Sequence, residues 1–187
     1  ALMEAGNSLE QSIALQVAAN NVIQDPEAVG TMGKTVSMRI RGAKTELEDA
    51  GLDTELMAES TSKLRDNIKA ITNINGSGGF DILTDSGNFK STYDIIFGIG
   101  KEGENIKKAD PIGSASLLEM LAGKRQENAL AAALNNVEDL QKALQTSITS
   151  TNSAMKENEK YLNSIQGKID QFKATVQKLS MNTINSG

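Results

Sequence analysis

The sequence predicts an all-α fold: several capped helices joined by short loops, followed by a long amphipathic C-terminal helix with a coiled-coil-like seam. Three observations support this prediction. Apolar residues recur at alternating steps of four and three from position 137 to 183, a period typical of a helix that packs along another helix. Helix start signals recur along the chain. Only six residues are aromatic, so small and aliphatic side chains must fill the core, which suits helix-to-helix packing.

Three helix starts can be predicted from local sequence. The string SLEQ at 8–11 is a capping box, in which the Ser and Gln side chains bind free amides at the start of a helix. The two prolines follow aspartates, at 25–26 and 110–111. Aspartate accepts bonds from free amides, and proline fits the first helical position because it has no amide to satisfy. We therefore expect helices to begin at all three places.

The remaining helices of the first half are expected from apolar spacing and glycine. The helix that begins at the first proline should run over 26–50, with Gly51 as a left-handed C-cap. Asp53 or Thr54 can open the next helix, which should end in the glycine-rich stretch 73–79.

In the second half we expect at most one short strand near 80–83, then helices at 89–97 and 111–135, and finally the seam from 137 onward. The residues at 149–153 are hydroxyl-bearing or amide side chains that form helix weakly. They predict two helical stretches with a soft joint rather than one continuous helix.

The chain divides by composition into three segments: helical 1–75, a glycine-rich loop with a short helix at 76–110, and helical 111–187. There is no Met at position 1, and the seam is still running near position 183. We therefore expect the chain to be part of a longer protein.

Composition excludes several classes of function. Cysteine and histidine are absent, which excludes disulfides, thiol catalysis, histidine-based triads and imidazole metal sites. The formal net charge of -5 provides no broad attraction for DNA or anionic lipid, so we expect no DNA contact. The longest apolar run, 129–134, is far shorter than the roughly 20 residues needed to span a bilayer.

Two glycine strings resemble nucleotide-binding motifs but lack the required context. GKT at 33–35 resembles the end of a P-loop, yet Ala28 stands where that motif needs glycine, and no strand precedes it. GIGKEG at 98–103 fits a dinucleotide motif, but the helix behind it would end before Pro111. We expect helix surface at the first string and a loosened helix end at the second. A nucleotide-binding enzyme stays an alternative; we expect no cofactor and no small-molecule substrate.

Charged residues mark one possible contact surface. Lys34, Arg41 and Lys44 share a helical face, flanked by Arg39, and this basic face could meet an acidic partner or simply be solvated. Acidic pairs such as 48–49 lack the convergent spacing that metal binding or acid–base catalysis needs, so we expect no enzyme activity.

The candidate functional residues are instead the apolar members of the seam, which we expect to pair with another helix, within one chain or between chains. These helix-pairing positions are Leu144, Ile148, Met155, Leu162, Ile165, Ile169, Phe172, Val176 and Leu179. If the sites are buried, a charge at Ile165 or Ile169 should cost about 2–5 kcal/mol.

Several longer strings resemble the core region of bacteriophage tail tape-measure proteins. They are LAGKRQENAL at 121–130 followed by LNN at 134–136, ENEKYLNSIQGK at 157–168, AANNVIQDP at 18–26, KTVSMRIRGAK at 34–44 and FKSTYDI at 89–95. Together these strings cover much of the chain in the same order as in the family.

The resemblance implies a long, mostly helical structural protein in the tail of a siphophage, prophage or phage-tail-like particle, made in the host bacterial cytoplasm. Such a protein sets tail length, scaffolds assembly of the tail tube and is released during DNA ejection. The resemblance also implies contacts with tail-tube protein, tail-tip proteins and assembly chaperones. A generic helical coiled-coil interaction module is the alternative that keeps the seam and discards the family.

Overall fold

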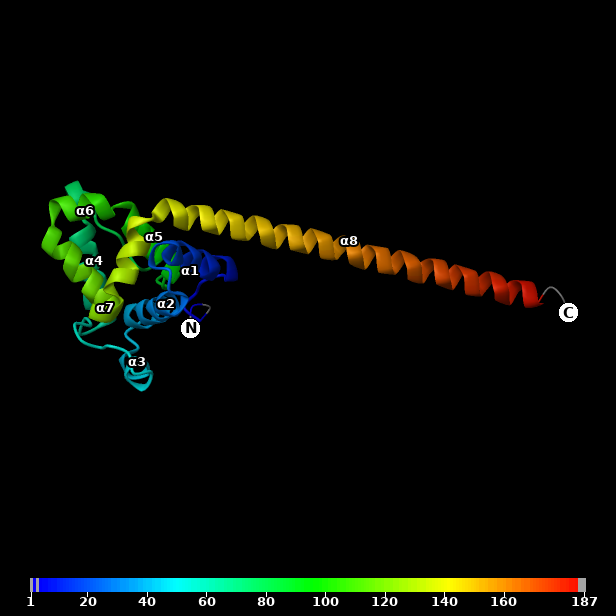
Figure 1. The fold of residues 1–187 in the computed structure, drawn as a ribbon, viewed down its shortest axis with the longest axis horizontal. Helices are drawn as coiled ribbons and strands as arrows, with labels where there is room; N and C mark the ends of the chain where they lie inside the picture. Colours follow the sequence, from blue (N-terminus) through cyan, green and yellow to red (C-terminus); the bar gives the residue numbers. More distant parts are fainter. Residues whose placement is uncertain (1, 3, 185–187) are drawn as a thin grey trace. The chain divides into compact units, whose positions relative to one another are not determined.

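The computed structural model describes residues 2 and 4–184, without the side chains of 161, 171–172 and 174–184. Its helices are α1 (Leu9–Ile23), α2 (Pro26–Ile40), α3 (Lys44–Asp49), α4 (Thr61–Thr72), the 3-10 turn η1 (Ile74–Gly76), α5 (Thr92–Lys101), α6 (Gly103–Ala109), α7 (Pro111–Asn135) and α8 (Val137–Ile184). The described residues form no strand, only one antiparallel bridge between Leu83 and Phe89. The all-α prediction is confirmed (Figure 1).

The chain forms two units, Ala1–Ser147 and Ile148–Gly187, which do not follow the expected segments 1–75, 76–110 and 111–187. In the first unit α7 packs against α1, α2, α4, α5 and α6. The core between them is aliphatic and includes Met32, Ile96 and Leu121, each fully buried. Small and aliphatic side chains therefore fill this core, as the composition predicts.

The three predicted helix starts are confirmed. Ser8 and Gln11 form both bonds of the capping box at the start of α1. Asp25 accepts bonds from the amides of Glu27 and Ala28 at the start of α2. Asp110 accepts from the amide of Gly113, with proline at the first position of α7. These starts depend on contacts within four residues, which explains why local sequence predicts them.

The single helix expected over 26–50 is wrong, because the chain forms two helices there. Gly42 takes φ +70°, and the amide of Ala43 donates to the carbonyl of Met38 at 3.0 Å, a bond that closes a helix end. The expected end at Gly51 is confirmed: its φ is +67°, and α3 ends two residues before it.

Two other helices begin later than the sequence predicts. Helix α4 starts after Ser60, which caps the amide of Lys63, and not at Asp53 or Thr54. Helix α5 starts after Ser91, which caps the amide of Asp94, and not at 89. In both cases a serine closer to the buried residues provides the N-cap.

The expectation of a soft joint at 149–153 is also wrong: α8 is one continuous helix from Val137 to Ile184. The Ser153 hydroxyl donates to the carbonyl of Thr149 at 2.9 Å, so it bonds to the turn before it and leaves the helical backbone intact. Strong helix formers on both sides, such as Ala143 and Lys156, carry the helix through the weak stretch.

Candidate helix-pairing surface

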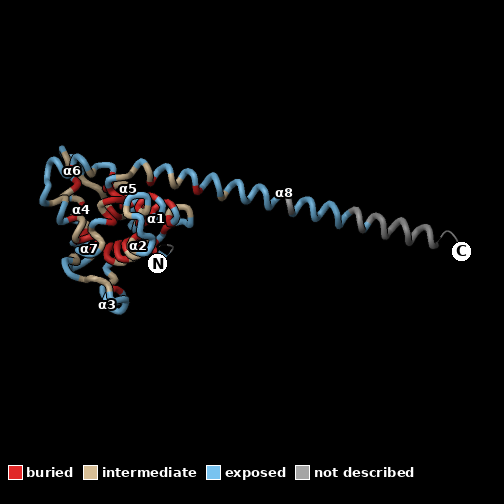
Figure 2. The backbone as a smooth tube through the Cα atoms, viewed as in Figure 1, coloured by how far each residue is buried: buried red, intermediate tan, exposed pale blue. Residues whose placement is uncertain are grey.

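Beyond Ser147, the described side chains of helix α8 are almost all exposed (Figure 2), and they include members of the predicted apolar stripe. The exposed fractions are Ile148 38%, Met155 66%, Leu162 56%, Ile165 38% and Ile169 42%. These residues lie three, four or seven apart, so they share one side of the helix. The stripe is therefore exposed in the second unit, and pairing within one chain or between chains stays a prediction.

The other predicted seam residues have different surroundings. Leu144 belongs to the first unit, where it is half-buried against the core. The side chains of Phe172, Val176 and Leu179 lie outside the described residues. The apolar pattern of α8 thus contributes to the core of 1–147 at its start and is exposed over 148–169.

The polar side chains that flank the stripe are mostly charged and exposed to solvent. Lys156, Lys160 and Lys168 are exposed, and the Lys160 ammonium lies 3.6 Å from a Glu157 carboxylate. An exposed pair of this kind contributes little stability, because water and salt screen it. What remains is an apolar stripe with charged margins, the pattern of a helix that packs along a partner helix.

The predicted basic face does not act as one surface. Lys44 is exposed, with its ammonium 3.9 Å from Glu48, and Lys34 is half-buried. The Arg41 guanidinium binds inward, donating to the carbonyls of Ser37 and Ala5. Arg41 therefore joins α2 to the N-terminal segment, and the alternative of a fully solvated face is also wrong for this residue.

Arg39, expected as a flanking charge, is buried, with 2% of its surface exposed. Its guanidinium donates to four backbone carbonyls: those of Met120 (3.0 Å) and Glu119 (3.1 Å) in α7, and those of Asp53 (2.6 Å) and Glu55 (2.5 Å). Burial lowers the pKa of Arg39 from its usual value, and the nearby Asp53 charge acts in the opposite direction. A single side chain therefore ties α2, α7 and the segment before α4 together.

The two α7 carbonyls that Arg39 binds, those of Glu119 and Met120, lie in the turn before Gly123, where φ is +68° and ψ +166° and the helix is broken. A Cβ atom there would lie 2.8 Å from an Asp53 carboxylate oxygen and 3.1 Å from an Arg39 nitrogen. Only glycine fits this backbone conformation and this space. One sequence signal could have located the site: Arg39 lies in helical register with the buried Val29, Met32 and Val36.

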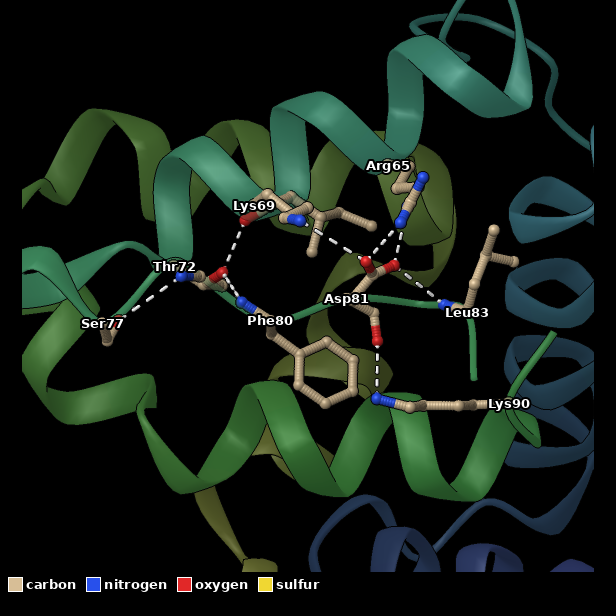
Figure 3. Close-up of polar contacts among 10 residues, drawn as sticks. Arg65, Lys69, Thr72, Ser77, Phe80, Asp81, Leu83 and Lys90 are labelled. Atoms are coloured by element: carbon tan, nitrogen blue, oxygen red, sulfur yellow. Dashed lines mark hydrogen bonds and ion pairs between the residues drawn. The ribbon is translucent and has the colours of Figure 1, made fainter. Parts of the chain in front are cut away.

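A second polar cluster holds the loop between α4 and α5 (Figure 3). Asp81 accepts two bonds from Arg65 and one from the amide of Leu83, and Lys69 lies 3.4 Å away. The Arg65 guanidinium holds the pKa of Asp81 well below its usual value. Lys90 donates to the Asp81 carbonyl at 2.8 Å. The cluster attaches the loop to α4, and all its charged groups are partly exposed.

The glycine strings serve helix packing. Gly33 and Thr35 are buried within α2, so the expectation of helix surface is wrong for them. A Cβ on Gly98 would meet the Phe80 ring at 2.0 Å, and one on Gly100 would meet Val137 at 2.4 Å. The glycines of the second string therefore allow close approach to neighbouring segments. The helix end expected there is present, since α5 ends at Lys101 within the string.

The described residues were compared with the features of metal and small-molecule sites and of membrane spans. No group of three or more acidic side chains among them could hold a metal ion. An apolar pocket lined by Ile99, Ile106, Leu117 and Leu134 has a volume of about 130 Å³, less than the roughly 300 Å³ at the lower end for ligand pockets. A more open hollow of about 400 Å³, lined among others by Thr72, Phe80 and Lys101, lies within that range. None of the helices described is both long enough and apolar enough to cross a bilayer.

Comparison of the chain with protein-family models, curated proteins and solved structures found no match.

Proposed function

We propose that this chain is part of a phage tail tape-measure protein: a helical ruler and scaffold for tail-tube assembly that is released during DNA ejection. Two kinds of support bear on the proposal. The strings at 121–130, 157–168 and 18–26 resemble that family. The exposed apolar stripe over 148–169 has the spacing of a surface that packs along a partner helix, which supports a role in assembly. Tail-tube protein, tail-tip proteins and assembly chaperones are the proposed partners, in the virion tail and, during assembly, in the host cytoplasm.

The stripe is the observation that carries the proposal. The described side chains of residues 148–169 are almost all exposed in one chain, and an isolated helix in water is only marginally stable. Burying one Leu or Ile side chain contributes about 1.5–3 kcal/mol. Several such side chains on one side therefore favour pairing with a helical neighbour, and self-association is the simplest such pairing.

Sedimentation equilibrium of the chain from about 1 to about 300 μM tests pairing. We expect a reversible rise in mass with concentration, and we expect Ile165→Asp to abolish it because the charge falls on the stripe. Asn163→Asp adds the same charge beside the stripe and should associate like the parent. A parent chain that stays monomeric over the whole range would contradict pairing through this surface.

A generic coiled-coil module would also associate, so a second test asks whether the protein sets tail length. Removal of two heptads, 150–163, from the whole protein in its particle should shorten the tail by about 21 Å at 1.5 Å per residue. An adaptor outside the tail would leave tail length unchanged. Genes for tail-tube and tail-tip proteins beside the coding gene would likewise favour the tail protein.

A nucleotide-dependent enzyme is the competing proposal from another class. Its candidate strings lie within α2 and across α5 and α6, without the strand, loop and helix that cradle a phosphate. Titration with ATP or NAD while the melting temperature is followed tests it: a saturable rise would support an enzyme, and we expect none.

A further inference from the structure

Helix α1 has a second apolar side that the core does not use. Its inner side, including Leu15 and Ala18, is fully buried. On the outer side Leu9, Ile13 and Val17 are exposed by 55%, 41% and 45%. They lie four residues apart and so form one ridge. A helix that is apolar on both sides is expected to be covered on both sides, and we call these three residues the α1 ridge.

Charge indicates what covers the α1 ridge. Residues 1–33 contain four acidic residues and no Lys or Arg, whereas residues 148–187 contain five lysines and three acidic residues. The second unit therefore carries +2, and the first carries the remaining -7 of the chain total of -5. Two second units repel each other, while a first and a second unit attract. Electrostatics favours a contact between the α1 ridge and the stripe.

The pattern of the stripe also disfavours pairing with an identical stripe. Ile148, Met155, Leu162 and Ile169 occupy one heptad position, but the adjacent core position holds the polar Thr151 and Asn158. In a parallel, in-register pair, Lys168 of one helix would face Lys173 of the other. A symmetric pair would therefore combine polar core layers with like charges at its margin.

We propose that the α1 ridge of one copy docks on the 148–169 stripe of a second copy, in a head-to-tail contact. This inference rests on the proposed function, because it requires the stripe to pair with a helix, and it names the partner surface. The ridge spans about 12 Å and the stripe about 32 Å, so the stripe can cover the whole ridge. Because the two surfaces differ, a pair of copies in contact still has one free α1 ridge and one free stripe. Further copies can bind there, so the assembly extends as an open chain.

Complementation between two variants tests the contact. Ile13→Asp disables the α1 ridge and Ile165→Asp disables the stripe. Each variant alone should be monomeric, with a dissociation constant raised by at least about tenfold. Mixed in equal amounts they should form a heterodimer, because the first keeps an intact stripe and the second an intact ridge. Association of the parent should weaken by about tenfold between 0.05 and 0.5 M NaCl, because salt screens opposite charges.

Matched controls separate docking from folding. Asn128→Asp, on α7, and Asn163→Asp add the same charge at exposed positions off the ridge and off the stripe, and both should associate like the parent. Ile13→Asp should keep the parent melting temperature when measured at monomeric concentration. The chain has no cysteine, so Ile13→Cys in one copy and Leu162→Cys in another should form an interchain disulfide in the mixture.

Each other outcome decides against a specific claim. If Ile13→Asp associates like the parent while Ile165→Asp does not, the head-to-tail contact is wrong and stripe pairing stands. If Ile165→Asp associates like the parent, stripe pairing itself is wrong. If both variants and their mixture are monomeric, the two residues share one symmetric interface and the proposal is overturned. A disulfide formed within one chain carrying both cysteines, at high dilution, would also overturn it.

Discussion

Residues 1–147 and 148–187 cover their apolar side chains in different ways. In the first unit, side chains such as Ile96 and Leu121 are fully buried among α1, α2, α4, α5 and α7. In the second unit, Leu162 and Ile169 are about half exposed on a single helix. The first unit thus buries its apolar side chains within one chain, whereas we propose that the second buries its stripe against a partner. Folding of the first should be independent of concentration, and ordering of the second should depend on it.

Polar groups differ between the units in the same way. Arg39 is buried and binds four carbonyls, so each of its bonds is protected from water. Lys160 pairs with Glu157 while both are more than three-quarters exposed. Substitutions should therefore have large effects on the stability of the first unit and small effects on that of the second.

The largest expected effect comes from Arg39→Ala. The four carbonyls would lose their donor inside the core, and the free energy of unfolding of residues 1–147 should fall by about 3 kcal/mol or more. Urea unfolding followed by circular dichroism measures it. Arg125→Ala, at an exposed position of α7, is the control and should change little. Equal effects of the two substitutions would mean that the Arg39 bonds are not formed.

The same substitution in each unit gives a sharper comparison. Gly123→Ala should destabilise the first unit by about 1–3 kcal/mol, because alanine does not adopt that backbone conformation. Gly167→Ala lies in a helix with nothing within 4 Å of a Cβ atom, so it should stabilise the second unit's helix by about 1 kcal/mol. Urea unfolding measures the first, and amide hydrogen exchange over 160–173 the second. Effects of the same sign would contradict this reading of the two glycines.

The smallest effect concerns pH. The pKa of Asp81 is lower in the folded chain than in the unfolded chain, chiefly through its bonds from Arg65. Its contribution is therefore present above its unfolded pKa of about 3.8, and it is lost as pH falls through the folded pKa. Asp81→Asn should lower stability slightly at pH 6, and the difference from the parent should shrink below about pH 4.

Unfolding free energies measured between pH 2 and pH 7 check this. Asp85→Asn, at an exposed position of the same loop, should follow the parent across that range. A difference between Asp81→Asn and the parent that grows on acidification would show that the carboxylate does not stabilise the fold.

Local sequence determined the all-α class, the starts of α1, α2 and α7, and the end of α3 at Gly51, because caps and glycine C-caps depend on residues within one turn. The 3-4 period also predicted which side of α8 is apolar, because that period is a property of the helix itself. The same local reasoning failed for 149–153, since helix formers on both sides outweigh a short weak stretch.

Only the tertiary structure decided which polar and glycine residues are buried at contacts between distant segments. Arg39 is buried where α7 breaks at Gly123 and presents two backbone carbonyls to it, a match between residues at least 80 positions apart. Gly98 and Gly100 pack against Phe80 and Val137, contacts that no motif shows. The apolar period of α8 is the same before and after Ser147, yet only the first part is covered. Periodicity determines which side chains share a face; which neighbour covers that face is determined by the fold of the whole chain.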